Sequence, residues 1–304
     1  MLLALFTSLL SASESPLLTP RDKFFDIACA GKNSVRIAGA FGRIIGIDDK
    51  DAWSRILPGN PTIYSLWFYG QKGWAVGAQG ALFYSRDNGR KWSRLPAPTD
   101  ESLFAVRFLN GKTGYVLGNF GTALRTQDGG LRWSKVALPY PKDYSDPSLN
   151  SIFFIDQSRG WIAGEFGLIF HTADAGRSWV RQRSGVNASL FKILFRNPAT
   201  GYAVGMNGVI LFTKDGGKNW KTIAGKNNDH LPALGLHKDK IWVGGGNGTL
   251  LKIENEQVER VFIETREGIS SISFCPDQTG FIAGNHGLLL SSKDDGIFWR
   301  PMRP

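Results

Sequence analysis

The chain has 304 residues, of which 42% are hydrophobic and 20% are charged, and its 36 Lys and Arg exceed its 26 Asp and Glu by a net charge of +10. This composition is typical of a globular protein and excludes an intrinsically disordered one. No apolar run approaches the roughly 18 residues that a membrane-spanning helix requires. The basic residues are spread along the whole chain, which argues against a nucleic-acid-binding tail and against a nucleic-acid partner.

Residues 1–13 have the pattern of a signal peptide. An apolar run over residues 1–10 is followed by small residues at Ser11, Ala12 and Ser13, in the order of a hydrophobic region and a cleavage site. The positive charge that normally precedes the apolar run is missing, so a start further upstream and a short buried strand are the alternatives. The pattern predicts an exported protein with a periplasmic location.

A glycine pair recurs along the chain at intervals of 38 to 46 residues. In each of seven units, a glycine is followed three positions later by a second one. The pairs are Gly39/Gly42, Gly77/Gly80, Gly118/Gly121, Gly164/Gly167, Gly205/Gly208, Gly245/Gly248 and Gly284/Gly287. Six units have an aromatic residue three positions before the first glycine, whereas the first unit has Arg36 there. Such regular self-similarity predicts a repeat architecture.

After each glycine pair, a short apolar stretch leads into the pattern Ser/Thr-x-Asp-x-Gly-x-x-Trp, which we call the clasp. Its hydroxyl and carboxylate oxygens can accept backbone N–H groups within a turn, the glycine permits positive φ, and the Trp ring can pack beneath the loop. We therefore expect a structural role for the clasp residues. The Asp and Trp of the five intact clasps are Asp87 and Trp92, Asp128 and Trp133, Asp174 and Trp179, Asp215 and Trp220, and Asp294 and Trp299.

Two units depart from the clasp pattern. The first keeps Asp48 and Trp53 but has Lys50 where the glycine belongs, and the sixth has Glu254 and Glu256.

The pattern within each unit predicts four strands. In the third unit these are an inner strand at 103–108, a second around 115–117, a third at 122–125 and an outer strand from Trp133. Seven such units without a helical pattern predict an all-β fold, a seven-bladed β-propeller with four-stranded blades that spans residues 21–304. A linear solenoid is the alternative, but it requires polar end caps that the sequence lacks.

The two cysteines of the chain, Cys29 and Cys275, fall one register apart on the inner strands of the first and seventh units. These units are neighbours in a closed ring. A disulfide between them is therefore a hypothesis, because export permits it and because a ring brings the two residues together.

The clasp is similar to the Asp-box, or bacterial neuraminidase repeat. The longer unit, in which an aromatic residue and the glycine pair precede the aliphatic stretch and the clasp, resembles the photosystem II stability/assembly factor family and its relatives in non-photosynthetic bacteria. The resemblance implies a non-catalytic exported scaffold, monomeric, that aids assembly or stability of a membrane protein complex. The partner implied is a photosystem II subunit, bound through an arginine patch in the thylakoid lumen, or a complex such as a transporter in a non-phototroph. No arginine patch can be matched residue by residue.

Enzymatic motifs are absent from the sequence. A sialidase needs an Arg-Ile-Pro triplet that this chain lacks, and that class has six blades rather than seven. The four histidines have no metal-ligand spacing, so no metal or cofactor is expected. A glycan- or cell-surface-binding module is the second hypothesis for function, and a glycoside hydrolase, with a carboxylate pair assembled across blades, is the third.

The turns between the second and third strands of the blades should share one face with the linkers between blades, and we call this the linker face. Aromatic side chains are expected at three of these turns, Phe41, Phe120 and Phe166, beside Asn119 and Glu165. Exposed aromatics favour a protein interface, and packing of each Phe into the neighbouring blade is the alternative.

The longest linker, residues 137–150, adds Tyr140 and Tyr144 to the candidate partner-binding residues. Long ordered loops often bind ligands, although this one could equally be a surface excursion without a function.

Basic residues follow the clasps, and in a ring they form a basic perimeter: Arg55, Arg94, Lys135 and Arg181. Such a perimeter could attract acidic partners or an anionic membrane surface. A solvated edge that prevents strand-to-strand aggregation explains the same residues.

Overall fold

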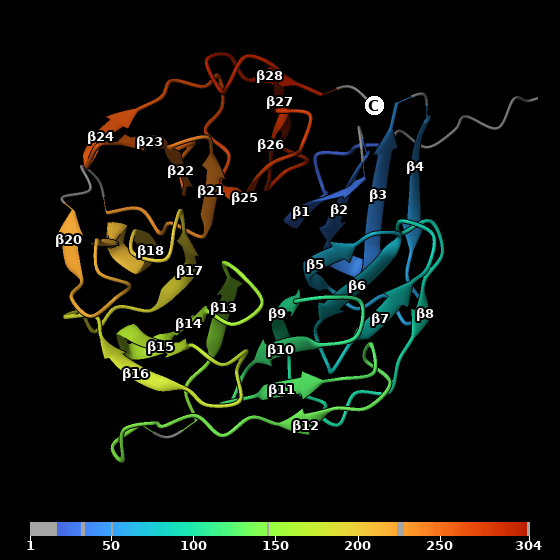
Figure 1. Ribbon diagram of the computed structural model, residues 1–304. Coiled ribbons are helices and arrows are strands. Elements are labelled where there is room, and N and C mark those ends of the chain that lie inside the picture. Colours follow the sequence, from blue (N-terminus) through green and yellow to red (C-terminus); the bar gives the residue numbers. More distant parts are fainter. Residues whose placement is uncertain (1–16, 32–33, 50, 145, 224–227, 303–304) are drawn as a thin grey trace, which may run out of the picture.

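The structure, a computed structural model, describes residues 17–31, 34–49, 51–144, 146–223 and 228–302, so the predicted signal peptide lies outside the described residues. The described residues form seven four-stranded antiparallel sheets that are arranged as blades around a central channel (Figure 1). Within each blade the strand order follows the chain, from the inner strand at the channel to the outer strand at the rim. The predicted seven-bladed β-propeller is confirmed.

The strands of blades 1 to 4 are β1 (Phe24–Gly31), β2 (Ser34–Gly39), β3 (Arg43–Asp48), β4 (Asp51–Ile56), β5 (Ile63–Tyr69), β6 (Lys72–Gly77), β7 (Leu82–Ser85), β8 (Ser93–Arg94), β9 (Leu103–Phe108), β10 (Gly114–Gly118), β11 (Ala123–Thr126), β12 (Ser134–Lys135), β13 (Leu149–Phe154), β14 (Gly160–Gly164), β15 (Leu168–Thr172) and β16 (Val180–Arg183). Those of blades 5 to 7 are β17 (Leu190–Phe195), β18 (Gly201–Gly205), β19 (Ile210–Thr213), β20 (Lys221–Ile223), β21 (Ala233–His237), β22 (Lys240–Gly244), β23 (Leu250–Glu254), β24 (Gln257–Arg260), β25 (Ile269–Phe274), β26 (Gly280–Gly284), β27 (Leu289–Ser292) and β28 (Arg300–Pro301). Single-turn 3₁₀ helices lie at Ala40–Gly42, Glu165–Gly167 and Met206–Gly208.

The blades bury their second and third strands most deeply. Every residue of β10 and β14 is buried, whereas both residues of β8 and both of β12 are exposed. The apolar stretches after the glycine pairs form the third strands, such as β7, β11, β15 and β19, and all but at most one residue of each of these is buried. These stretches are covered on both faces, as the sequence predicts.

The clasp geometry matches the expectation in all five intact copies. In blade 2, Gly89 N–H donates to Ser85 Oγ at 2.9 Å, and Lys91 N–H donates to Asp87 Oδ1 at 2.8 Å. The indole N–H of Trp92 donates to Gly89 O at 2.8 Å, and this bond holds the loop against the Trp92 ring. The same hydroxyl and carboxylate bonds recur in the other four clasps. These contacts support the structural role of the clasp residues.

The clasps also hold adjacent blades together, through the aromatic residue of the preceding blade. Trp74 Nε1 of blade 2 donates to Gly129 O in the clasp of blade 3 at 2.9 Å. Trp161 Nε1 of blade 4 donates to Gly216 O in the clasp of blade 5 at 3.2 Å. Tyr115 makes the corresponding bond from blade 3 to blade 4. At these three junctions, the aromatic residue and the next clasp are thus two halves of one contact between blades.

In blades 2 to 6, the second glycine of the pair donates its N–H to a carbonyl group of the linker that follows its blade. Gly80 N–H donates to Glu101 O at 3.0 Å, and its φ of +62° belongs to the left-handed region that glycine tolerates best. A Cβ atom on Gly80 would lie 2.1 Å from Thr99 O, so glycine is required there. The turns and linkers therefore share one face, as predicted.

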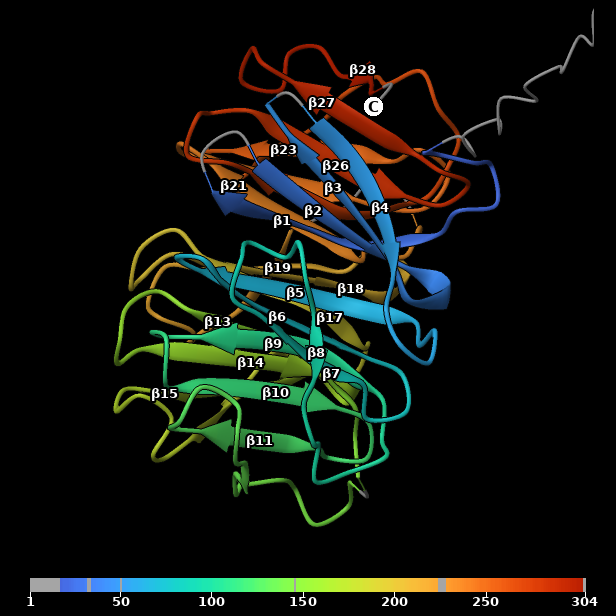
Figure 2. The ribbon, with the colours of Figure 1, turned by 90° about the vertical axis from the view of Figure 1, so that its right-hand side faces the viewer.

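The ring closes between blades 7 and 1 without a shared strand, because every blade consists of four consecutive strands (Figure 2). A disulfide joins Cys29 to Cys275 across this junction, with 5.6 Å between the Cα atoms. Ser271 Oγ donates to Asp26 Oδ1 at 2.9 Å beside it. The disulfide hypothesis is confirmed, and the solenoid alternative is wrong.

The clasp carboxylates make stability depend on acid pH. Hydrogen bonds from Ser178 lower the pKa of Asp174 to about 2, and the backbone and side chain of Asn219 do the same for Asp215. Since an unfolded Asp titrates near about 4, the unfolded chain binds protons first as pH falls. We expect the contribution of these two carboxylates to the free energy of unfolding to be constant above about pH 5 and to decrease as pH falls from about 4 to 2, as measured by urea unfolding at several pH values.

The double substitution of Asp174 and Asp215 by asparagine provides the control for this pH dependence. It removes two of the titrating groups while the amide oxygens can still accept the turn N–H bonds. We expect a shallower decrease below pH 4. An unchanged decrease in this variant would assign the acid sensitivity to other carboxylates.

Candidate functional site

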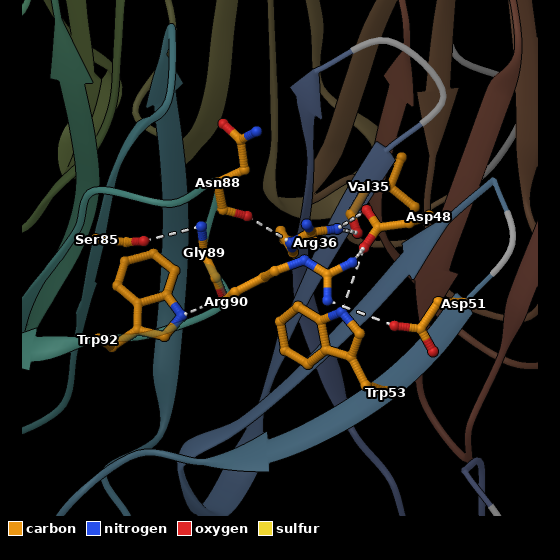
Figure 3. Close-up of polar contacts among 10 residues, drawn as sticks. All are labelled: Val35, Arg36, Asp48, Asp51, Trp53, Ser85, Asn88, Gly89, Arg90 and Trp92. Carbon is orange, nitrogen blue, oxygen red and sulfur yellow. Dashed lines mark hydrogen bonds and ion pairs between the residues drawn. The ribbon is translucent and has the colours of Figure 1, made fainter.

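A charged cluster lies between blades 1 and 2, where Arg36 stands in place of the aromatic residue (Figure 3). Its side chain is 1% exposed. Its Nε donates to Asn88 O at 2.7 Å and its Nη1 to Asp48 Oδ1 at 2.8 Å. The guanidinium carbon lies 4.9 Å from the centre of the Trp53 ring. Arg36 therefore reaches the clasp of the next blade as the aromatic residues do, and also carries a buried ion pair.

The Asp48 carboxylate of this cluster is held in the charged form. Burial alone would raise the pKa of Asp48, but hydrogen bonds from Ser34 and Arg36 and the positive charge of Arg36 hold it below its ordinary value. Arg90 binds Asp48 Oδ2 at 2.6 Å and Asp51 Oδ2 at 3.4 Å. A general acid requires a raised carboxyl pKa, so Asp48 has the wrong protonation state for glycosidase-type acid catalysis. The cluster is best explained as a bridge between blades.

The linker face carries three aromatic side chains in an unusual backbone conformation. Phe41, Phe120 and Phe166 have φ values of 55°, 48° and 55° and exposures of 75%, 64% and 43%. The equivalent positions of blades 5 and 6 have Asn207 and Asn247, a residue type that adopts this left-handed region more readily. Packing of Phe41 and Phe120 into a neighbouring blade is excluded by their exposure. Phe41 and Phe120 therefore occupy strained positions without the compensation of burial.

A stack of three side chains lies at the edge of blade 4 and joins residues from all three groups that the sequence singled out. The rings of Tyr144 and Phe166 are stacked with 5.0 Å between their centres and an interplanar angle of 29°. The guanidinium carbon of Arg181, on β16, lies 5.8 Å from the Tyr144 ring centre. We call Tyr144, Phe166 and Arg181 the aromatic–cationic stack. It offers aromatic and positively charged groups together at the surface.

The other three candidates on this side hold the long linker in place. Tyr140 OH donates to Gly121 O at 3.4 Å, and burial raises the pKa of the Tyr140 hydroxyl. Ser148 N–H donates to Glu165 Oε2 at 2.8 Å, and Ser148 Oγ is hydrogen-bonded to Asn119 Oδ1 at 3.1 Å. These contacts give Tyr140, Asn119 and Glu165 a positioning role, and direct partner contact by them stays a prediction.

The basic perimeter lies on the outer strands of four consecutive blades. Arg55, Arg94, Lys135 and Arg181 are exposed on β4, β8, β12 and β16. Within the described part of the chain, none of the four forms an ion pair. Partner attraction and edge protection both remain compatible with this placement.

In the part of the chain that the structure describes, no group of three His, Cys, Asp or Glu side chains is arranged to hold a metal ion. The helices among these residues are all too short or too polar to cross a bilayer.

Comparison with known proteins finds a family model that is similar to part of the chain. A family model described as "Photosynthesis system II assembly factor YCF48" matches residues 91–185. This segment contains the long linker, Phe120 and the whole aromatic–cationic stack. The resemblance inferred from the repeats is confirmed over these residues. No curated protein sequence matches the chain.

Solved structures show the same fold at low sequence identity. YCF48 from Cyanidioschyzon merolae is 18% identical with a TM-score of 0.76, and the match covers 92% of this chain and 98% of that one. "YCF48 bound to D1 peptide" is 18% identical with a TM-score of 0.72 and coverages of 92% and 99%. A GH74 xyloglucanase from Xanthomonas campestris is 12% identical with a TM-score of 0.77, and the match covers 96% of this chain and 55% of that one. At these identities the likeness concerns the fold, which assembly factors and enzymes share.

Proposed function

We propose that this protein is a non-catalytic scaffold that binds an extended segment of a membrane protein subunit on its linker face, and that it aids the assembly or stability of the membrane complex. The observation that carries the proposal is the exposure of Phe41, Phe120 and Phe166 in backbone conformations that bulky residues rarely adopt. Local strain of this kind is concentrated at binding sites, and aromatic side chains are enriched among the residues that dominate binding energy.

The comparisons support the class of partner. The family model matches the segment that contains the aromatic–cationic stack, and one similar propeller is described as bound to D1 peptide. By analogy, a photosystem II subunit is the proposed partner if the source is phototrophic, and another inner-membrane complex such as a transporter if it is not. The stack of Tyr144, Phe166 and Arg181 would bind apolar and acidic side chains of that segment.

We also propose export to an oxidising compartment. The Cys29–Cys275 disulfide supports this, because structural disulfides persist in the periplasm and in extracellular compartments and are rare in the cytosol. Secretion of the full chain in the source organism, followed by mass spectrometry of the mature N-terminus, tests both the export and the signal peptide at residues 1–13. A cytosolic protein with residues 1–13 retained would contradict this part of the proposal.

The partner is identified by placing a photocrosslinking amino acid at position 120 or 166 of the protein in its native cells. Position 218 provides the matched control, because Lys218 is exposed within a clasp on the opposite face. We expect crosslinks to one defined membrane protein subunit from positions 120 and 166 and not from 218. Crosslinks from 218 alone, or none from any position, would contradict a linker-face partner, and a sugar array would then test the glycan alternative.

Strain and binding can be separated with the double substitution Phe41→Asn and Phe120→Asn. Asparagine adopts the left-handed conformation at lower cost, so we expect the free energy of unfolding to rise by about 0.5–1 kcal/mol per site while partner binding weakens at least tenfold. Denaturant unfolding and affinity for the crosslinked partner measure the two effects.

The control for this double variant is Phe262→Asn. Phe262 is 85% exposed but has no left-handed backbone, and it lies beside the clasp residues Ile297 and Phe298. We expect neither stabilisation nor loss of binding. Unchanged affinity of the Phe41 and Phe120 variant for the partner would contradict the proposed role of these side chains.

A further inference from the structure

The inner strands of all seven blades surround the centre of the ring (Figure 1). Residues of these seven strands line a cavity of about 380 Å³. Most of its lining is aliphatic or aromatic, including Leu194, Leu236 and Phe274. Three charged side chains also line it, Asp26, Arg107 and Lys192, and they carry two positive charges against one negative. A volume of this size is within the range of small-molecule pockets.

Among the described residues, Arg107 has no carboxylate as a counterion. Its guanidinium carbon lies 3.7 Å from the Trp67 ring centre and 5.3 Å from that of Phe153, so the cation is close to two aromatic rings. It donates one hydrogen bond, from Nη2 to Phe154 O at 3.2 Å. No carboxylate among the described residues lies within ion-pair distance of it. Burial lowers the pKa of Arg107 to about 10, which still leaves it charged at neutral pH.

Both carboxylate oxygens of Asp26, the acidic residue of the channel lining, already accept hydrogen bonds. Its Oδ1 accepts the Ile27 N–H at 3.0 Å and the Ser271 hydroxyl at 2.9 Å, and its Oδ2 accepts the Leu66 N–H at 2.9 Å. The Asp26 carboxylate thus binds backbone and hydroxyl groups of the inner strands, and it does not pair with Arg107. The positive charge of the channel therefore stays uncompensated within the described residues.

Two further donors belong to residues that line the cavity. Trp67 Nε1 is buried and has no hydrogen-bond partner among the described residues. Lys192, across the channel on β17, forms no ion pair there. A guanidinium has five N–H donors in a planar fork, and burying unpaired charge and unpaired N–H groups is costly. Among the described residues, the lining of the cavity thus combines donors that have no ion-pair or hydrogen-bond partner with an excess of positive charge.

We propose that the channel is a binding site for a small organic acid, whose carboxylate is bound by Arg107 and Trp67 and whose apolar body packs against the aliphatic lining. A carboxylate fits the planar fork of Arg107 with two parallel hydrogen bonds. Lys192 adds a second positive charge, and the low-dielectric walls strengthen the attraction. The aliphatic lining favours an anion with an apolar body over an inorganic anion such as phosphate.

Calorimetric titration of the full protein with benzoate tests this site, with benzamide as the neutral isostere and inorganic phosphate as a third probe. We expect saturable binding of one benzoate per chain, at least tenfold weaker binding of benzamide, and weaker binding at high salt. Absence of benzoate binding, equal affinity for benzamide, or binding of phosphate in preference to benzoate would each overturn the proposal.

Substitution of Arg107 tests the assignment of residues. Arg107→Gln should weaken benzoate binding at least tenfold, whereas Arg183→Gln, which removes an exposed arginine from β16, should leave it unchanged. Benzoate should also raise the melting temperature of the wild type and of Arg183→Gln, but not that of Arg107→Gln. If Arg107 merely fills the channel, benzoate changes the melting temperature of none of the three proteins, and the proposal fails.

A second variant covers the case in which Arg107→Gln does not fold. Trp67→Phe keeps an aromatic wall beside Arg107 and removes only the unpartnered indole N–H, so we expect severalfold weaker benzoate binding with a similar melting temperature. Unchanged affinity in Trp67→Phe would remove that donor from the site and overturn its part of the assignment. The linker-face crosslinks from position 120 should persist in both variants, which separates this site from the proposed partner surface.

Discussion

Replacing Arg36 with alanine is expected to lower the free energy of unfolding by about 3–4 kcal/mol. The substitution removes a side chain that is 1% exposed, and it leaves Asn88 O and Val35 O without their donors. Asp48 loses one of its two arginine partners but keeps Arg90 at 2.6 Å. The decrease in the free energy of unfolding is therefore smaller than for a buried carboxylate left without any partner. Denaturant unfolding, followed by tryptophan fluorescence, measures the change.

Arg36→Trp distinguishes the bridge between blades from the ion pair. Blades 2 and 4 have Trp74 and Trp161 at this position, and their indole N–H groups reach the next clasp. We therefore expect Arg36→Trp to restore about half of the stability that alanine loses. Arg55→Ala, which removes an exposed arginine of the same blade, should change stability by less than about 0.5 kcal/mol. A loss below about 1 kcal/mol in Arg36→Ala would show that the cluster contributes little to the junction.

Removing the disulfide is expected to have an effect of similar size. Cys29 and Cys275 are 246 residues apart in sequence, and no strand is shared between blades 7 and 1. Closing so long a loop restricts the unfolded chain strongly, so the double substitution to alanine should cost about 4–5 kcal/mol and lower the melting temperature by roughly 10 °C.

The location of the effect is as informative as its size. We expect amide exchange to accelerate first in β1 and β2 of the double variant, because the disulfide holds blade 1 to blade 7 there. Addition of a reductant to the double variant should change nothing, which excludes an effect of the reagent itself. Uniform acceleration through all seven blades would contradict a disulfide that acts on the ring junction.

The sequence alone was sufficient for the architecture, because the interactions that set it are local. The clasp bonds join residues that are at most four positions apart, such as Gly89 to Ser85, so the motif contains its own geometry. The strands predicted for the third unit agree with β9 to β12 to within about two residues, as expected for element ends. The pairing of Cys29 with Cys275 could also be predicted, since a closed ring makes the first and seventh units neighbours.

Only the tertiary structure decided which residues meet between blades. Trp74 and Gly129 are 55 positions apart, and the sequence shows both without showing that they bond. Arg36 was visible only as a missing aromatic residue, and its ion pair and its contact with the next clasp depend on how two blades pack. Arg107 gave no signal at all, because an arginine in an ordinary inner strand becomes an unpaired cation only when seven strands enclose a channel. Local repeats determine the blades, whereas the chemistry lies where separate blades converge.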